Sequence, residues 1–191
     1  MTVPTDQPLF AFAGHRLLAR GPAAEVVAAV KAATDAGETV LTFDAATGRV
    51  VDLDLRGDAA AVLARLTPAP EEEKRGPGRP KLGVTAREVT LLPRHWDWLA
   101  GQPGGASVAL RKLVEGALKE AEGPDRARRA KEATYRFMTA IAGDLPGYEE
   151  ATRMLFAGDG PGLAAAVEGW PDGVRDAVRG MAAGAWGDGN G

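Results

Sequence analysis

The residues with the clearest chemistry are the basic ones in a short run that reads Lys74-Arg75-Gly76-Pro77-Gly78-Arg79-Pro80-Lys81. Glycine and proline disfavour both helix and central strand, so we expect the run to be an extended, solvated segment. Cations on such a segment bind phosphate groups, and a nucleic-acid duplex can order the segment as it binds. The predicted phosphate contacts are Lys74, Arg75, Arg79 and Lys81.

The charge of the chain is unevenly distributed. Residues 74–136 hold 14 Lys or Arg against 7 Asp or Glu, whereas the rest of the chain holds 9 against 19. A basic middle between acidic ends indicates a polyanion-binding segment on an otherwise acidic carrier. The alternative interpretation is that these charges form the solvated faces of ordinary helices.

Residue types suited to catalysis or metal binding are scarce. The chain has no cysteine, two histidines, His15 and His95, and one serine, Ser107, which is better placed to cap a helix than to act as a nucleophile. Asp52 and Asp54 could pair for acid–base work or bind a hard cation, but their alternation with Val and Leu already explains them as the solvated face of a strand. We therefore expect no enzyme activity, no cofactor and no metal site.

The elements that position these residues fall into regions of different composition. Residues 1–66 predict a small α+β domain. Its expected elements are a strand over 9–18, a helix over 23–33, a hairpin of strands 39–44 and 49–55, and a helix opened by Asp58. Residues 67–83, rich in proline and opposed charges, are typical of a linker. After a break at Gly123-Pro124, residues 124–183 predict a helical module and 184–191 a disordered tail.

Residues 84–122 predict a strand followed by two helices. Residues 85–92 alternate as a strand, and Leu92-Pro93 begins a short helix in which Trp96 and Trp98 point apart, leaving Trp98 free for an interface. Ser107 is the expected N-cap of a second helix. The apolar stripe of that helix is Leu110, Leu113, Val114, Ala117, Leu118 and Ala121. Because a lone strand with two helices cannot bury both its faces, we expect a homodimer through the 86–92 strand and the flanking helices.

The segment 87–93 with its short helix, the turn Gly104-Gly105-Ala106-Ser107 and the second helix resembles a ribbon-helix-helix DNA-binding domain. The resemblance implies an intertwined dimer whose antiparallel ribbon enters the major groove, while the N-terminus of the second helix holds a phosphate. It would make Ser107, with the amides of Val108 and Ala109, a phosphate ligand. Capping of the helix by Ser107 is compatible with this role.

The groove-reading face of this ribbon departs from the family pattern. The usual positions carry long polar side chains, and here they are Arg87, Val89 and Leu91, of which only one is polar. If the ribbon slips or bulges, Glu88 and Thr90 face outward instead. Arg87 and Thr90 are therefore the ribbon candidates for DNA contact, and the ribbon is expected to serve mainly dimerisation.

The basic run resembles an AT-hook, in which a Gly-Arg-Pro core lies along a narrow minor groove with its arginine inserted. Gly78-Arg79-Pro80 matches this core, but Pro77 stands where the full motif has an arginine. The match implies a preference for AT-rich DNA. The chain as a whole also resembles an uncharacterised family of bacterial proteins.

Together these features predict a cytoplasmic, nucleoid-associated homodimer that binds double-stranded DNA as a transcriptional regulator or nucleoid-type protein. No run approaches the roughly 18 apolar residues of a membrane span, so no membrane role is expected. The alternative is a protein-interaction adaptor in which the strand-helix-helix only dimerises and the terminal domains recruit a partner protein.

Overall fold

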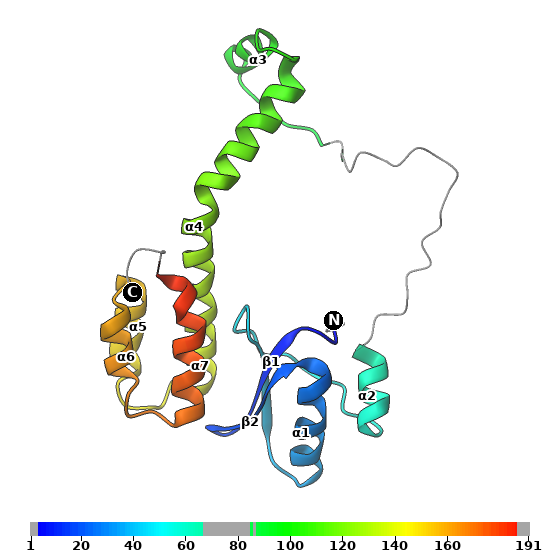
Figure 1. The fold of residues 1–191 in the computed structure, drawn as a ribbon, viewed down its shortest axis with the longest axis vertical. Coiled ribbons are helices and arrows are strands. Elements are labelled where there is room, and N and C mark those ends of the chain that lie inside the picture. Colours follow the sequence, from blue (N-terminus) through cyan, green and yellow to red (C-terminus); the bar gives the residue numbers. More distant parts are fainter. Residues whose placement is uncertain (1–3, 67–84, 86, 187–191) are drawn as a thin grey trace. The chain divides into compact units, whose positions relative to one another are not determined.

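The computed structural model describes residues 4–66, 85 and 87–186 (Figure 1). These residues form a mixed α+β fold with seven α-helices and one three-stranded antiparallel sheet, which confirms the α+β class but not the arrangement of domains predicted with it. Contacts divide the chain into two compact units. The first unit comprises residues 1–69 and 123–191, and the second comprises residues 70–122.

The sheet of the first unit has the order β2-β1-β3. Its strands are β1 (Pro8–Ala13), β2 (Arg16–Pro22) and β3 (Val40–Asp44). The predicted single strand over 9–18 is wrong, because the chain reverses at Gly14 and forms a β1–β2 hairpin. Gly14 has φ +56°, a left-handed conformation that glycine adopts without steric cost and that lets a turn form inside an apolar stretch.

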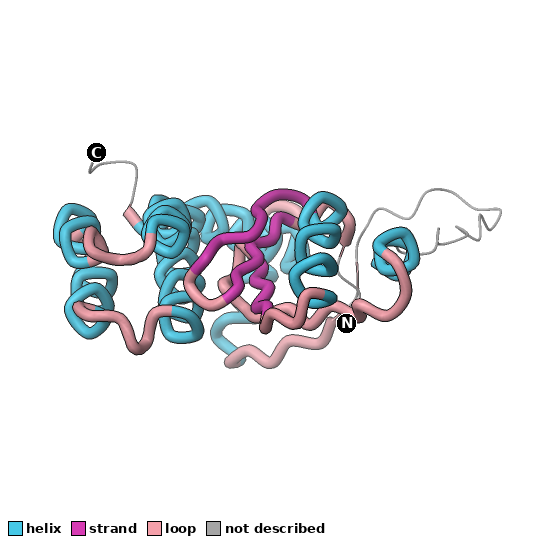
Figure 2. Tube along the Cα trace, turned by 90° about the horizontal axis from the view of Figure 1, so that it is seen from below, coloured by secondary structure: helices cyan, strands magenta, loops and turns pink. Residues whose placement is uncertain are grey.

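Strand β1 is buried on both faces of the sheet. Leu9 and Ala11 pack on one side with helix α1 (Ala23–Asp35) and helix α2 (Ala59–Leu66), while Phe12 packs on the other with the C-terminal helices. Figures 1 and 2 show the strands between α1 and the C-terminal helices. A strand covered on both sides needs apolar residues throughout, which explains the unbroken sequence Leu-Phe-Ala-Phe-Ala.

The C-terminal part of the first unit is helical and shares a core with the sheet. Its helices are residues 123–141 of α4 (Gly105–Ile141), α5 (Tyr148–Ala157), α6 (Gly160–Ala166) and α7 (Asp172–Ala182), followed by the short η1 (Ala183–Ala185). Phe137 of α4 lies 4.9 Å from Phe43 and 5.6 Å from Phe12 between ring centroids. Residues 1–66 and 124–183, expected to be separate domains, therefore lie in one compact unit.

Residues 49–55 do not form the second strand of the predicted hairpin. Their contacts with β3 are an isolated bridge between Phe43 and Val50 and two backbone hydrogen bonds, from the Asp44 amide to the Arg49 carbonyl and from the Val51 amide to the Thr42 carbonyl. The predicted alternation of burial nevertheless holds, since Leu53 is buried while Asp52 and Asp54 are exposed. Apolar side chains can thus dock on α1 and α2 without a regular ladder.

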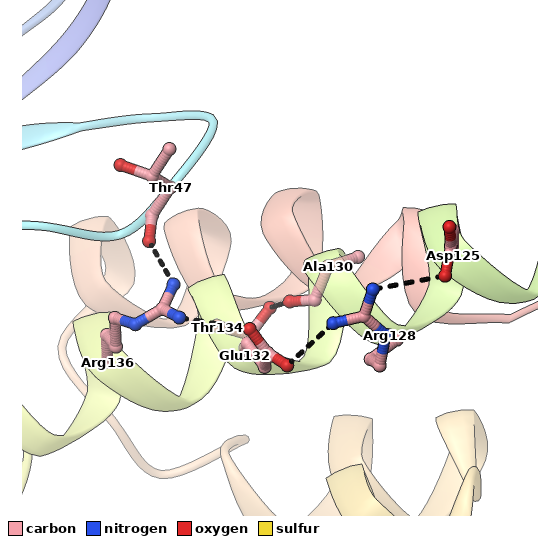
Figure 3. Close-up of polar contacts among 7 residues, drawn as sticks. All are labelled: Thr47, Asp125, Arg128, Ala130, Glu132, Thr134 and Arg136. Atoms are coloured by element: carbon pink, nitrogen blue, oxygen red, sulfur yellow. Dashed lines mark hydrogen bonds and ion pairs between the residues drawn. The ribbon is translucent and has the colours of Figure 1, made fainter. Parts of the chain in front are cut away.

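The turn between β3 and this segment contacts helix α4. Asp44 accepts hydrogen bonds from the amides of Ala46 and Thr47, which fix the turn. Arg136 of α4 donates to the Thr47 carbonyl at 3.0 Å (Figure 3). Gly48 lies so close to α4 that a Cβ atom at this position would be 1.9 Å from the carbonyl oxygen of Ala133.

The second unit contains α3 (Pro93–Ala100) and the first part of α4. The predicted start of α3 at Leu92-Pro93 is confirmed, with Pro93 in its first turn. The predicted helix break at Gly123-Pro124 is wrong, because α4 continues through Pro124, but the boundary between the two units does fall between residues 122 and 123. Proline removes one intrahelical hydrogen bond at this position, but a helix of 37 residues has many others that keep it continuous.

Candidate nucleic-acid interface

The structure describes three of the predicted DNA contacts. Arg87 and Thr90, ahead of α3, and Ser107, in the first turn of α4, are all exposed and belong to the second unit. The four cations of the basic run, Lys74, Arg75, Arg79 and Lys81, lie outside the described residues.

Residues 87–92 enter α3 without forming a helix or strand within the chain. Leu92 has extended backbone angles, φ −68° and ψ 150°, and its carbonyl accepts hydrogen bonds from the amides of His95 and Trp96. Leu91 is half-buried against α3 and α4, whereas Thr90 is exposed. The side chains that could face the major groove are either Arg87, Val89 and Leu91 or Glu88 and Thr90. Leu91, the last residue of the first set, faces α3 and α4.

Ser107 is the third residue of α4 rather than its N-cap, because the helix begins two residues earlier, at Gly105. Gly104 and Gly105 have φ values of +85° and +75°, which glycine tolerates and a serine at the same place would not. The first four amides of a helix have no acceptor within it and carry a partial positive charge. Ser107 and the neighbouring amides thus lie at an electropositive helix end.

The described part of the second unit has an apolar groove between α3 and α4. One cavity of about 290 Å³ is lined by Leu91, Arg94, His95, Trp98, Leu99, Leu110 and Leu113. A second cavity, of about 170 Å³, shares Trp98 and Leu113 with the first. Trp98 is 54% exposed, as predicted for a side chain that is available for an interface, and Trp96 is exposed as well.

The sequence pattern alone does not identify this groove as a site. The sequence does contain one indication of the groove, the apolar stripe on α4, in which Leu113, Val114 and Leu118 follow at helical spacing. The eight-residue α3 is too short to cover a stripe of this length. All three side chains are more than half exposed.

The arginines after Pro124 are engaged largely in contacts within the protein. Arg128 pairs with Asp125 at 3.0 Å and with Glu132 at 3.3 Å, and these carboxylates raise the pKa of its guanidinium (Figure 3). Arg136 pairs with Glu132 at 3.0 Å besides its bond to Thr47. At these two positions the structure thus supports the second interpretation of the basic residues in 74–136, that they are charges on solvated helix faces.

Asp54 is an ion-pair partner and not a candidate general base. Arg56 donates to both of its carboxylate oxygens, at 2.8 and 2.6 Å, and Arg65 lies 3.3 Å away. The hydrogen bonds from Arg56, together with the charges of Arg56 and Arg65, hold the pKa of Asp54 well below its usual range. A carboxylate stabilised in this way is a poor proton acceptor at neutral pH.

This ion pair predicts a pH effect on stability. Because the pKa of Asp54 is lower in the folded state, its contribution is complete above the unfolded-state pKa of about 4 and is lost as the pH falls below it. In the Asp54→Asn variant we expect the urea midpoint of unfolding to decrease less than in the unchanged protein as the pH falls below about 4. Arg56→Gln should have the same effect, because it removes the main partner. An unchanged acid limb in both variants would contradict the assignment.

The described residues contain no group of three or more His, Cys, Asp or Glu side chains that could hold a metal ion. Within the same residues, no helix is both long and apolar enough to span a membrane. His95 lines the apolar groove beside Arg94 and Trp98.

Comparison with known proteins gives a family for the chain. No curated protein and no solved structure matches it. A family model does match, and the match runs from β1 to the end of α7, so it includes both units. The chain therefore belongs to the bacterial family described as "Uncharacterized protein conserved in bacteria (DUF2239)", whose model matches residues 8–182.

Proposed function

We propose that this protein binds double-stranded DNA in the bacterial cytoplasm, as a transcriptional regulator or a nucleoid-type protein. The observation that carries the proposal is the exposed segment with Arg87 and Thr90, which follows the basic run in sequence and leads directly into α3. Such a segment can approach a duplex without opening a packed core.

Each group of residues has a distinct role in this proposal. Lys74, Arg75, Arg79 and Lys81 contact phosphates and the minor groove, as the likeness of Gly78-Arg79-Pro80 to an AT-hook implies. Arg87 and Thr90 approach base edges, as in a ribbon-helix-helix domain. Ser107 and the first amides of α4 hold a phosphate at the electropositive helix end.

This arrangement makes a quantitative prediction about salt. Each phosphate contact contributes about −0.9 to the slope of log affinity against log salt. Four contacts on each chain therefore predict that affinity falls by about 100-fold for every chain that engages the duplex between roughly 50 and 200 mM salt. Fluorescence anisotropy of a labelled AT-rich duplex with the full chain measures this slope.

Two variants and a second duplex sharpen the test. Arg79→Ala should weaken binding and lower the magnitude of the salt slope by about 1 for every bound chain, because each chain loses one phosphate-side cation. Arg20→Ala, which removes an exposed arginine of the first unit, is the matched control and should leave both quantities unchanged. A GC-rich duplex should bind less tightly. No binding at low salt, or equal effects of the two substitutions, would refute the proposal.

A second candidate function, a protein-interaction adaptor, is favoured by a surface on the first unit. Tyr135 and Phe156 form an exposed ring pair 5.4 Å apart, and Phe156 borders a cavity of about 290 Å³ with Pro124 and Ala127. Exposed aromatic side chains beside a cavity are common at protein interfaces. The adaptor would self-associate without binding the duplex at low salt, so the anisotropy experiment separates the two functions.

A further inference from the structure

The second unit buries few of its own apolar side chains. Among its described residues, 85 and 87–122, Leu99 and Ala109 are the buried ones. Seven larger apolar residues are 40–65% exposed: Val89, Leu92, Trp96, Trp98, Leu113, Val114 and Leu118. Two buried side chains cannot offset the conformational entropy of ordering this many residues. Further burial, against another surface, is needed.

The exposed apolar area around the groove is a large part of what a stable interface requires. An aromatic side chain buries roughly 150–250 Å², so the half-exposed Trp98, together with the aliphatic Leu113, Val114 and Leu118 of α4, presents several hundred Å². A standard interface buries about 800 Å² per partner, and free monomers rarely leave apolar patches this large in contact with water. The α3–α4 surface can therefore supply a large part of one side of an interface.

This surface contains both a groove and the side chains that could fill one. Trp98 and Leu113 line the two cavities, while Val114 and Leu118 project from the next positions of the α4 stripe. In a two-fold pair the same patch acts on both chains, so projecting side chains of one copy can enter the groove of the other. A surface of this kind is suited to self-association.

The charges around the stripe fit a second copy better than a strongly charged partner. The charged residues of this stretch are Arg111, Lys112, Glu115, Lys119 and Glu120, three basic and two acidic. A surface of mixed sign has little net repulsion against itself and little attraction for a polyanion or a polycation.

We infer that a second copy of this chain covers the groove between α3 and α4, with Leu113 at the centre of the contact. The helices, rather than the 87–92 segment, supply most of the binding energy, because they carry most of the exposed apolar area. The inference goes beyond the proposed function, since the pair forms without DNA.

The test is the mass of the full chain in solution without DNA, by light scattering and sedimentation. We expect twice the chain mass of 19.8 kDa. Leu113→Glu should weaken self-association by at least about 100-fold, because it brings a charge into the centre of the contact. Phe156→Glu is the matched control: Phe156 and Leu113 are both 52% exposed, but Phe156 belongs to the first unit, so its substitution should leave the dimer intact.

Other results would overturn the inference. A chain that remains a monomer at micromolar concentration would show that the groove is covered by a different protein or by the rest of its own chain. A dimer that survives Leu113→Glu, or that is broken equally by Phe156→Glu, would place the contact elsewhere. If Leu113→Glu misfolds, Leu118→Glu tests the same contact, because Leu118 is 65% exposed and lies further along α4. This variant should also weaken self-association.

Discussion

We expect Gly48→Ala to be among the most destabilising single substitutions in this chain, lowering the free energy of unfolding by about 4 kcal/mol. The added Cβ atom would lie 1.9 Å from the carbonyl oxygen of Ala133, so either the turn or helix α4 must move. The residue also has φ +65°, which alanine adopts only with strain. Movement of the turn would break the bond from Arg136 to Thr47. Urea denaturation followed by circular dichroism measures the loss.

Gly37→Ala is the control for this prediction. Gly37 also has a left-handed conformation, φ +84°, but no atom lies within 4 Å of the position that its Cβ would occupy. It should therefore lose only about 1 kcal/mol, the cost of the backbone strain. Equal losses in the two variants would show that close contact between the turn and α4 does not stabilise the fold.

We expect Phe137→Ala to lower the free energy of unfolding by about 4 kcal/mol as well, the usual cost of removing a buried ring from a core. Phe137 is fully buried, and its ring contacts those of Phe10, Phe12 and Phe43. The substitution therefore weakens the contact between the N-terminal sheet and the C-terminal helices. A single transition at lower urea concentration is expected, because the two parts share this core.

Phe156→Ala is the matched control for the core prediction. Phe156 is 52% exposed and contacts Tyr135 at the surface, so its loss should cost about 1 kcal/mol or less. Two separate transitions in Phe137→Ala, one for the sheet and one for the helices, would contradict the shared core.

Elements with a strong local signal could be predicted from the sequence. Helix α1 follows the spacing of Val26, Val27 and Val30, and α2 begins where Asp58 caps it by accepting from the Ala61 amide. The start of α3 at Pro93 followed from the fixed φ of proline. In each case neighbouring residues contain the necessary information.

Features that depend on distant contacts could not be predicted in the same way. The unbroken apolar character of β1 indicates burial on both faces, but nothing local shows that α4 to α7 form the second layer. Residues 49–55 alternate like a strand although their apolar members dock on helices. Alternation reports burial on one side, and it does not distinguish a ladder from an irregular segment.

The candidate site was predictable in part. Trp98 is exposed as predicted, and Arg87 and Thr90 are exposed, as their proposed contacts with DNA require. The start of α4 before Ser107 was missed, because two glycines with positive φ lead into the helix and such a start has no side-chain signal. The groove around Leu113 requires α3 and α4 to be placed side by side, which spacing along one helix does not reveal.

The most direct test of the proposed function is the stoichiometry of a complex between the full chain and a short AT-rich duplex, measured by native mass spectrometry at low salt. We expect a complex of two chains and one duplex that dissociates as salt is raised, because the cations of both copies meet phosphates. A folded dimer that leaves the duplex free at low salt would contradict DNA binding and favour the adaptor function.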